Sequence, residues 1–363
     1  MSIRTLQRVA AVGLALVGAC APGLAAASGT PAFVDPLDAP AALAASPARQ
    51  PMTAVAYAGS RLVAVGQRGV IVVSDDRGQT WRQVPSPVQS DLTAVTFSSA
   101  TEGWAVGHDG VILHSSNGGQ TWAKQLDGRI ANARFVAYYR AAVASGNASA
   151  APLLQQEERN AKAGASLPWL DVWFDTPQRG YAVGSFGIVA VTTDGGKNWL
   201  PGLEYVDNPD FLNLNAIRGI GGDIFIAGER GTVFRLDRSS GRFARLSSGY
   251  TGSFFGIAGS GQRLFAFGLR GTVYESTDRG DTWQQARSGT DSSLNDAATL
   301  ADGTVVICGS RALLLAGDPV TGELRRVSAD TPMMFAGIAA NRDGQVALSG
   351  SSGVMIESIA ARR

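Results

Sequence analysis

The stretch VAVGQRGVIVVSDDRGQTW, residues 63–81, contains the unit from which most of this chain is built. An apolar segment runs into a Gly-x-x-Gly turn, a second apolar segment follows, and a Ser-x-Asp-x-Gly-x-Thr-Trp motif ends the unit. Short strands separated by turns and repeated every ~40 residues are typical of β-propeller blades, which have four antiparallel strands each. The stretch therefore predicts a repeat protein made of β-sheets.

The glycine pair occurs seven times along the chain. Its copies are Gly66/Gly69, Gly107/Gly110, Gly184/Gly187, Gly228/Gly231, Gly268/Gly271, Gly309 with Ala312 in the second place, and Gly350/Gly353. Successive copies lie ~40 residues apart, except for a step of ~77 residues between the second and the third. The repeats predict an all-β fold: a seven-bladed β-propeller of four-stranded antiparallel blades over residues 52–361, with an insertion at residues 129–166 between blades two and three.

The insertion has the pattern of helices. Its halves, ARFVAYYRAAVAS (133–145) and LLQQEERNAKAGA (153–165), are rich in residues that favour helices. Four residues of the first half are spaced to share one helix face: Phe135, Tyr138, Tyr139 and Val143. We therefore expect a helical hairpin, which either packs its aromatic face on the rim of the propeller or serves to bind a partner or cap the ring.

The Ser-x-Asp-x-Gly-x-Thr-Trp motif, an Asp box, has four clear copies. They are SDDRGQTW (74–81), SSNGGQTW (115–122), TTDGGKNW (192–199) and STDRGDTW (276–283). The short acidic or amide side chain can accept backbone N–H bonds inside the turn, and the Trp can bury its ring against the sheet. Four repetitions of one internally bonded turn predict a structural role and not a catalytic or metal-binding one. The residues concerned are Asp76, Trp81, Asn117, Trp122, Asp194, Trp199, Asp278 and Trp283.

The N-terminus has the pattern of a secretory signal peptide. Basic residues precede an apolar run, and small residues follow, so residues 1–27 are expected to be removed on export. Cleavage after Ala27 would release a periplasmic protein, whereas the sequence Val17-Gly18-Ala19-Cys20 resembles a bacterial lipobox that would place a lipid anchor on Cys20. Both routes are open at this stage.

Residues 28–51, rich in Ala and Pro, precede the first blade. The last repeat ends near Ile359 after its third strand, and a propeller left in this way has an open sheet edge. We therefore expect residues 28–51 to close the ring, with Phe33 to Leu37 as the added strand. Pro36 would confine that strand to an outer position, because proline cannot donate to a β-ladder.

The composition excludes several classes of function. The formal net charge is +1 and 17% of the residues are charged, which gives no general attraction to nucleic acid or to a membrane surface. With Cys20 removed or lipid-modified, Cys308 has no partner for a disulfide and is expected to be a buried strand residue. No cluster of His, Cys and Asp has the spacing of metal ligands. We expect a monomer that needs no metal or cofactor.

Arginine dominates the turns between the paired glycines. In blade order, the second residue of each turn is Arg68, Asp109, Phe186, Arg230, Arg270, Arg311 and Ser352. Successive hairpins of a meander alternate between the two faces of a propeller, so these turns should form a circle on one face and the Asp boxes should lie on the other. Grouped guanidinium groups suit an anionic partner such as a peptide C-terminus or an acidic loop. Alternatively, the arginines pair with neighbouring acids such as Asp109 or Glu229.

One enzymatic interpretation is open. Sialidases also carry Asp boxes on a propeller and hold a carboxylate through arginines, with Tyr as the nucleophile. That chemistry also requires an Arg-Ile-Pro-type strand, a Tyr–Glu pair and an acid–base Asp, and the sequence shows no such set. We therefore predict that the protein is not an enzyme and keep a sialidase-like glycan hydrolase as the alternative.

The arginine-bearing turns, the segments GWAVG (103–107) and GYAVG (180–184), and the Asp boxes together resemble the photosystem II assembly and stability factor family, especially its bacterial, non-photosynthetic relatives. The resemblance implies an exported, non-catalytic seven-bladed propeller whose arginine patch contacts a membrane-protein partner during assembly. By this resemblance the patch would consist of Arg68, Arg230, Arg270 and Arg311.

Two features depart from the family pattern. The helical insertion is not part of the pattern in phototrophs, and the patch is interrupted at Asp109, Phe186 and Ser352. Relatives with a similar insertion tend to accompany inner-membrane transporters of the resistance–nodulation–division type. The expected partner is therefore either a photosystem-like membrane protein or such a transporter.

Overall fold

The computed structural model describes residues 33–329, 332–341 and 343–359. The expected signal peptide at residues 1–27, with Cys20, lies outside the described residues, as do residues 28–32 and the last residues of the expected propeller domain. From Asp35 onward the chain forms one compact unit.

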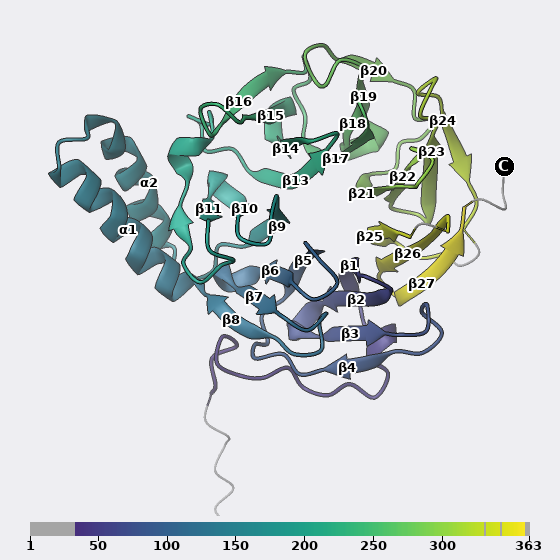
Figure 1. The fold of residues 1–363 in the computed structure, drawn as a ribbon, viewed down its shortest axis with the longest axis horizontal. Coiled ribbons are helices and arrows are strands. Elements are labelled where there is room, and N and C mark those ends of the chain that lie inside the picture. The colour runs from purple at the N-terminus through teal and green to yellow at the C-terminus, as the bar shows by residue number, and fades with distance from the viewer. Residues whose placement is uncertain (1–32, 330–331, 342, 360–363) are drawn as a thin grey trace, which may run out of the picture. The chain divides into compact units, whose positions relative to one another are not determined.

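Seven antiparallel sheets stand in a ring in this unit (Figure 1). Each sheet is a meander whose first strand lines the central channel. In the described residues six sheets have four strands and the last has three, so the predicted all-β, seven-bladed propeller is confirmed. Blades one to three contain β1 (Met52–Ala58), β2 (Arg61–Gly66), β3 (Ile71–Ser74), β4 (Arg82–Val84), β5 (Leu92–Phe97), β6 (Gly103–Gly107), β7 (Ile112–Ser115), β8 (Ala123–Leu126), β9 (Trp169–Phe174), β10 (Gly180–Gly184), β11 (Val189–Thr192) and β12 (Leu200–Pro201). Blades four to seven contain β13 (Leu214–Ile220), β14 (Asp223–Gly228), β15 (Thr232–Asp237), β16 (Arg242–Ser247), β17 (Phe254–Ser260), β18 (Arg263–Gly268), β19 (Val273–Ser276), β20 (Gln284–Ala286), β21 (Leu294–Thr299), β22 (Val305–Gly309), β23 (Leu313–Gly317), β24 (Leu324–Val327), β25 (Phe335–Ala340), β26 (Gln345–Gly350) and β27 (Gly353–Ser358).

The core consists of the interfaces between blades. Each blade lies between two others, so the second strand is covered on both faces, and residues 62–65 of β2 are fully buried. Strands covered in this way have continuous apolar runs in place of strict alternation. Between blades two and three, the ring of Trp104 stacks on that of Phe174 with centroids 3.4 Å apart. Cys308 in β22 is also fully buried.

Hydrogen bonds near the channel join one blade to the next. Each inner strand has a register shift at its start, where a β-bulge can redirect a side chain. In four of the described blades the residue at this position is Thr or Asn, and its side chain donates to the carbonyl oxygen of the first residue of the next inner strand. The bonds run from Thr53 Oγ1 to Leu92 O (2.5 Å), from Thr93 Oγ1 to Trp169 O (2.7 Å), from Asn215 Nδ2 to Phe254 O (2.7 Å) and from Asn295 Nδ2 to Phe335 O (2.6 Å).

The N-terminal segment does not form the expected strand. The structure assigns no strand to residues 33–51, and Pro36 to Asp38 form a turn. The reason is local, because Asp35 Oδ1 accepts the N–H of Leu37 (2.9 Å) and Asp35 O accepts that of Asp38 (2.8 Å). The segment instead crosses blade one and ends in a 3₁₀ helix, η1 (Pro47–Arg49), which contacts both β4 and β27. It thus bridges the junction of blades one and seven without adding a strand.

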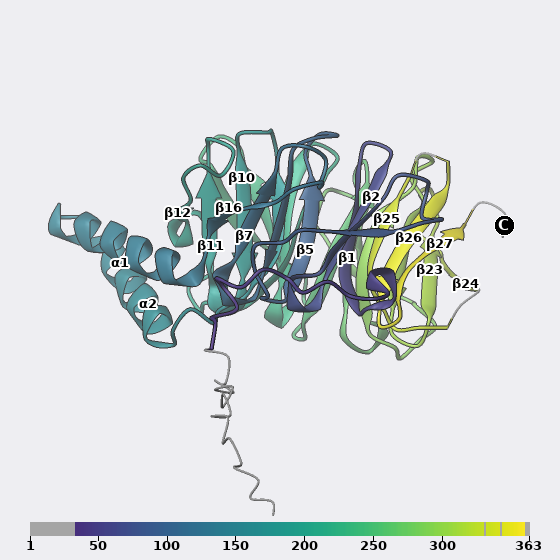
Figure 2. The ribbon, with the colours of Figure 1, turned by 90° about the horizontal axis from the view of Figure 1, so that it is seen from below.

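The insertion is a pair of helices, α1 (Gly128–Ala144) and α2 (Ala151–Lys162), which pack on each other. Both begin before the predicted segments. In the two views the pair lies outside the ring of blades, beside blade three (Figure 2). Phe135 and Tyr139 of the predicted aromatic face are buried, whereas Tyr138 is 37% exposed.

Candidate functional site

The Gly-x-x-Gly turns lie between the second and third strands of each blade and therefore share one face of the ring, which we call the turn face. The Asp boxes occupy the opposite face, the box face. In six turns the second residue between the paired positions has a left-handed backbone. The φ values are 54° at Arg68, 57° at Asp109, 54° at Phe186, 51° at Arg230, 55° at Arg270 and 59° at Arg311. Few residues other than Gly, Asn and Asp adopt this conformation.

The turn in blade one shows why this conformation is fixed. The N–H of Gly66 donates to Val70 O (2.9 Å), and the N–H of Val70 donates to Gln67 O (3.1 Å). Gly69 has φ 71°, and a Cβ atom there would lie 1.9 Å from the carbonyl oxygen of Val88. These bonds and the close approach at Gly69 hold the turn in this conformation, which leaves the side chain of Arg68 exposed.

The four arginines differ in their partners. Arg230 Nη1 lies 3.9 Å from Asp210 Oδ2, and Arg311 Nη1 lies 3.1 Å from Asp291 Oδ1. In both ion pairs the arginine and the aspartate side chains are more than half exposed. Exposed ion pairs of this kind contribute about 0–1 kcal/mol to stability. Among the described residues, Arg68 and Arg270 have no ion-pair partner. Two guanidinium groups are thus unpaired and two are weakly paired.

The acids that the sequence suggested as partners have other roles. Asp109 Oδ2 accepts from Ser90 Oγ (2.6 Å), and Glu229 Oε2 accepts from the backbone N–H of Asn213 (2.9 Å). The acids that do approach the arginines, Asp210 and Asp291, lie in the links between blades. Their positions depend on loop paths that no repeat pattern specifies.

Residues immediately before the inner strands hold adjacent turns together. Asp91 Oδ1 accepts the N–H of Arg68 (2.7 Å), and Asp91 O accepts that of His108 (2.8 Å). At the equivalent place in blade four, Asn213 Oδ1 accepts the N–H of Phe186 (2.6 Å). The turn face is therefore a set of mutually fixed loops.

The Asp boxes form closed hydrogen-bond systems on the box face. Asp76 Oδ1 accepts the N–H of Thr80 (2.9 Å) and the hydroxyl of Ser74 (2.8 Å), and the indole N–H of Trp81 donates to Gly78 O (3.1 Å). Asn117, Asp194 and Asp278 make the equivalent bond to the backbone four residues on. Hydrogen bonds from Thr80 and Ser74 lower the pKa of Asp76 to about 2.

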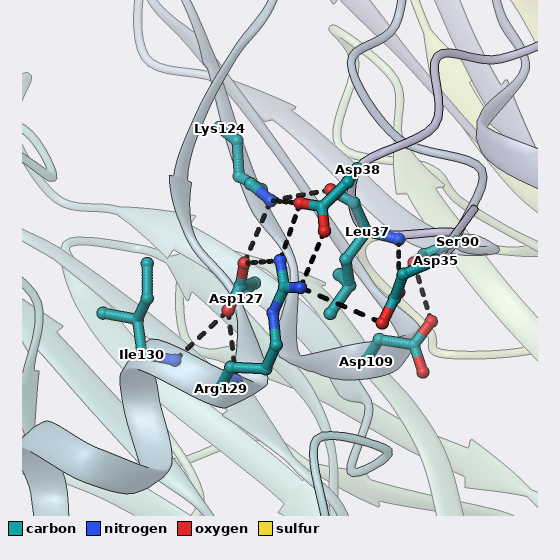
Figure 3. A network of polar contacts seen from close by, with 9 residues as sticks. All are labelled: Asp35, Leu37, Asp38, Ser90, Asp109, Lys124, Asp127, Arg129 and Ile130. Carbon is teal, nitrogen blue, oxygen red and sulfur yellow. Dashed lines mark hydrogen bonds and ion pairs between the residues drawn. The ribbon is translucent and has the colours of Figure 1, made fainter. Parts of the chain in front are cut away.

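A second charged site on the turn face surrounds the start of α1 (Figure 3). Asp127 is buried and caps the helix, because its Oδ1 accepts the N–H groups of Arg129 (3.1 Å) and Ile130 (3.2 Å). The guanidinium of Arg129 binds both carboxylate oxygens of Asp38 at 2.8 Å and Asp127 Oδ2 at 3.0 Å. Lys124 Nζ lies 2.9 Å from the same Asp127 oxygen.

This second site binds an acidic stretch of the chain itself. The hydrogen bonds from Arg129 lower the pKa of Asp38 to about 2. Lys124 Nζ also donates to the carbonyl oxygen of Leu37 (2.7 Å), whose side chain is buried. Sequence reasoning missed Arg129 and Lys124. The available signal was Asp127, two residues before the predicted insertion, because Asp is a favoured N-cap residue and its second carboxylate oxygen can accept from a nearby cation.

The central channel contains an ion cluster that sequence reasoning also missed, in which Asp171 is buried and Arg218 and Asp296 are partly exposed. A cavity of about 290 Å³ is lined by the inner strands. Within it Arg218 of β13 binds Asp171 of β9 and lies 3.4 Å from Asp296 of β21. Burial raises the pKa of both carboxyl groups, against the opposing effect of Arg218. The three residues lie in different repeats, so no local pattern associates them.

Within the part of the chain that the structure describes, no group of three or more His, Cys, Asp or Glu side chains could hold a metal ion. No described helix has the length and apolar character to cross a membrane.

The fold and the two faces define an Asp-box β-propeller whose turn face carries exposed arginines. A family model described as "Photosynthesis system II assembly factor YCF48" matches residues 49–135 and 158–315, more than half of the chain. The chain therefore belongs to this assembly-factor family. The unmatched residues between these ranges include most of the helical pair.

Solved structures show the same fold. A structure of YCF48 bound to D1 peptide and one of YCF48 from Cyanidioschyzon merolae are each 16% identical to this chain, with TM-scores of 0.61. Each alignment covers 88% of this chain, and 99% and 97% of the respective structures. The WD40 β-propeller domain of Doa1 is 11% identical, with a TM-score of 0.59 over 88% of this chain and 95% of its own. No curated protein matches the chain.

Proposed function

We propose that this protein is a non-catalytic, exported propeller that binds an acidic segment of a membrane protein and assists assembly or stability of a membrane complex. The binding residues in this proposal are Arg68, Arg230, Arg270 and Arg311. The supporting observation is that four exposed arginines share one face and one backbone conformation, while Arg68 and Arg270 have no ion-pair partner among the described residues. Such donors suit carboxylates.

Two other observations support peptide binding. One of the similar solved structures is that of YCF48 bound to D1 peptide. In the present chain, the bidentate contact of Arg129 with Asp38 is an intramolecular case of the same chemistry on the same face. The partner in this proposal is a photosystem-like membrane protein, with a transporter of the resistance–nodulation–division type as the alternative.

Export and anchoring are part of the proposal. Residues 1–27 would direct export, and the periplasmic protein would be either soluble or anchored through a lipid on Cys20. Detergent-phase partition of the wild-type protein and of Cys20→Ser distinguishes these routes. Partition into detergent that is lost in the variant indicates the anchor, and equal aqueous partition indicates release.

The experiment that tests binding is affinity capture of partners from solubilised membranes, followed by mass spectrometry. Arg68→Glu/Arg270→Glu reverses two unpaired cations, so we expect recovery of the partner to fall by about tenfold or more. The melting temperature should hardly change, because exposed turn substitutions usually alter stability by less than about 0.5 kcal/mol.

The matched control is Arg77→Glu. Arg77 is also exposed and left-handed, with φ 62°, but it belongs to an Asp box and so lies on the box face. Its replacement should leave capture unchanged. Undiminished capture by the double variant would refute the proposed site, and a collapse in melting temperature would show that the arginines stabilise the fold.

A further inference from the structure

Phe186 occupies the position that arginine occupies in four other blades. Its backbone is left-handed, with φ 54° and ψ 31°, which is rare for a bulky residue. Its side chain is nevertheless 57% exposed. An exposed apolar side chain contributes little to folding. Backbone strain of this kind is concentrated at functional sites.

The phenylalanine turn is rigidly joined to the next arginine turn. Asn213 Oδ1 accepts the N–H of Phe186 (2.6 Å), while the N–H of Asn213 donates to Glu229 Oε2 (2.9 Å). The N–H of Glu229 donates in turn to Asn213 O (3.1 Å). Since Arg230 follows Glu229, the exposed ring and the guanidinium belong to adjacent turns fixed by a single residue.

Other exposed apolar side chains accompany the arginines on the turn face. Leu269, directly before Arg270, is 41% exposed. Met334, in the link between blades six and seven, is 53% exposed. Its N–H donates to Ser351 Oγ of the blade-seven turn (3.3 Å), and its carbonyl oxygen accepts the N–H of Ser351 (3.1 Å). Blades three to seven follow one another around the ring (Figure 1), so Phe186, Leu269 and Met334 are interspersed with the arginines along one arc. The order is Phe186, Arg230, Leu269, Arg270, Arg311 and Met334.

We propose that the arc of blades three to seven binds an extended peptide in which carboxylates alternate with bulky apolar side chains, and that Phe186 is the residue that selects for the apolar component. This inference rests on the proposed arginine site and extends it. The carboxylates of the peptide are inferred from charge complementarity with the arginines. Its apolar side chains are inferred from the exposed apolar side chains beside those arginines.

The test uses two synthetic ten-residue peptides of equal negative charge. In one, Asp alternates with Leu and Phe; in the other, Asp alternates with Ser. Fluorescence anisotropy with the full chain should show the apolar peptide binding about tenfold more tightly, because it buries one or two large apolar groups. Phe186→Asn should remove most of this advantage and leave the Kd of the serine peptide unchanged.

The variants separate the possible outcomes. Asn tolerates the left-handed backbone, so Phe186→Asn should fold, and Phe186→Gly provides a second variant with the same expectation. The control is Val320→Asn, since Val320 is 80% exposed in the β23–β24 turn of the box face. Equal affinity for both peptides, or an undiminished advantage in both Phe186 variants, overturns this inference and leaves the arginine site intact. If neither peptide binds, both this inference and the proposed arginine site are overturned.

Discussion

Arg218 joins several inner strands of the ring. It joins inner strands of blades three, four and six, and its two acidic partners also accept backbone N–H groups of the following blades. Asp171 Oδ2 accepts from Ile217 N (2.7 Å), and Asp296 Oδ2 accepts from Ile338 N (3.1 Å). The cluster therefore fixes the relative positions of blades as well as neutralising charge.

Replacing Arg218 by Met should destabilise the protein by about 3 kcal/mol, because it leaves the buried Asp171 and the partly exposed Asp296 without their cation. Urea denaturation followed by tryptophan fluorescence measures the loss. The loss should shrink as the pH is lowered, since burial already raises the pKa of Asp171 and Asp296 and protonation removes the unpaired charge.

A compensating variant tests this explanation. Adding Asp171→Asn and Asp296→Asn to Arg218→Met keeps an acceptor for each backbone bond and removes both charges. Stability should then largely return. A single variant that loses under ~1 kcal/mol, well below the cost of an unpaired buried charge, would show that the cluster contributes little.

At the scale of elements, the Asp-box hairpins predict a specific acid sensitivity. Hydrogen bonds from Thr residues lower the pKa of Asp76 and Asp278 to about 2, from an ordinary value of 3.8. A carboxyl with a lowered folded-state pKa stabilises the fold above its unfolded pKa and loses this effect as the pH falls to the folded value. The contribution of both boxes should therefore disappear between about pH 4 and pH 2.

The variant Asp76→Asn/Asp278→Asn tests this window. Blade two already carries Asn117 at the same place, and its amide oxygen makes the same backbone bond. Since Asn does not titrate, the melting temperature of the variant should fall less than that of the wild type between pH 4 and pH 2. Parallel acid profiles would contradict the assignment.

The helical pair predicts a dependence of the opposite sign. Burial raises the pKa of Glu157 in α2 to about 7, and its Oε1 has no hydrogen-bond partner among the described residues. The folded state therefore binds this proton more tightly than the unfolded state, whose pKa is 4.5. The contribution of Glu157 to stability is therefore most favourable below pH 4.5 and becomes less favourable by up to about 3 kcal/mol as the pH rises from 4.5 to 7.

Hydrogen exchange of the α2 amides, corrected for the intrinsic pH dependence, measures this effect locally. Protection should decrease between pH 5 and pH 8 in the wild type and stay constant in Glu157→Gln. Gln156 lies beside it on the same helix and is also buried but does not titrate, so Gln156→Ala should lower protection equally at every pH. A wild-type profile without pH dependence would show that Glu157 is already charged in the fold.

At the scale of the whole molecule, the repeat explains what the sequence could predict. Six glycine pairs, the related Gly309–Ala312 turn and four Asp boxes each encode a local turn, so their positions determine the number of blades and the two faces. The same period places Arg68, Arg230, Arg270 and Arg311 on one face, because equivalent residues of a ring lie on a circle.

Interactions that cross repeats had no such signal. Asp171, Arg218 and Asp296 lie on inner strands of three different blades. They meet only because the blades form a closed ring whose inner strands face a common channel. The strand expected at residues 33–37 was wrong because Asp35 directs a turn, a local bond that competes with strand pairing. The position of residues 33–51 in the sequence was enough to predict that they lie at the junction of blades one and seven. Their local conformation depends on the hydrogen bonds of Asp35.

The last prediction concerns this segment, residues 28–50. Within it Leu37 is buried against blades one and two, and the carbonyl oxygen of Ala48 contacts Gly353 at the start of β27. Deleting residues 28–44 should cost at least as much as Leu37→Ala, about 2–5 kcal/mol, because it removes the same buried side chain together with the contacts of Asp38 with Arg129 and of Leu37 O with Lys124. Deleting residues 28–50 also removes η1, which covers the outer strand of blade seven, so this variant should in addition form dimers or aggregates through the exposed edge. Thermal melting and light scattering of the two deletions measure the two effects separately. If both deletions remain monomeric, the ring is closed by the packing of β1 on β25 and β26 alone.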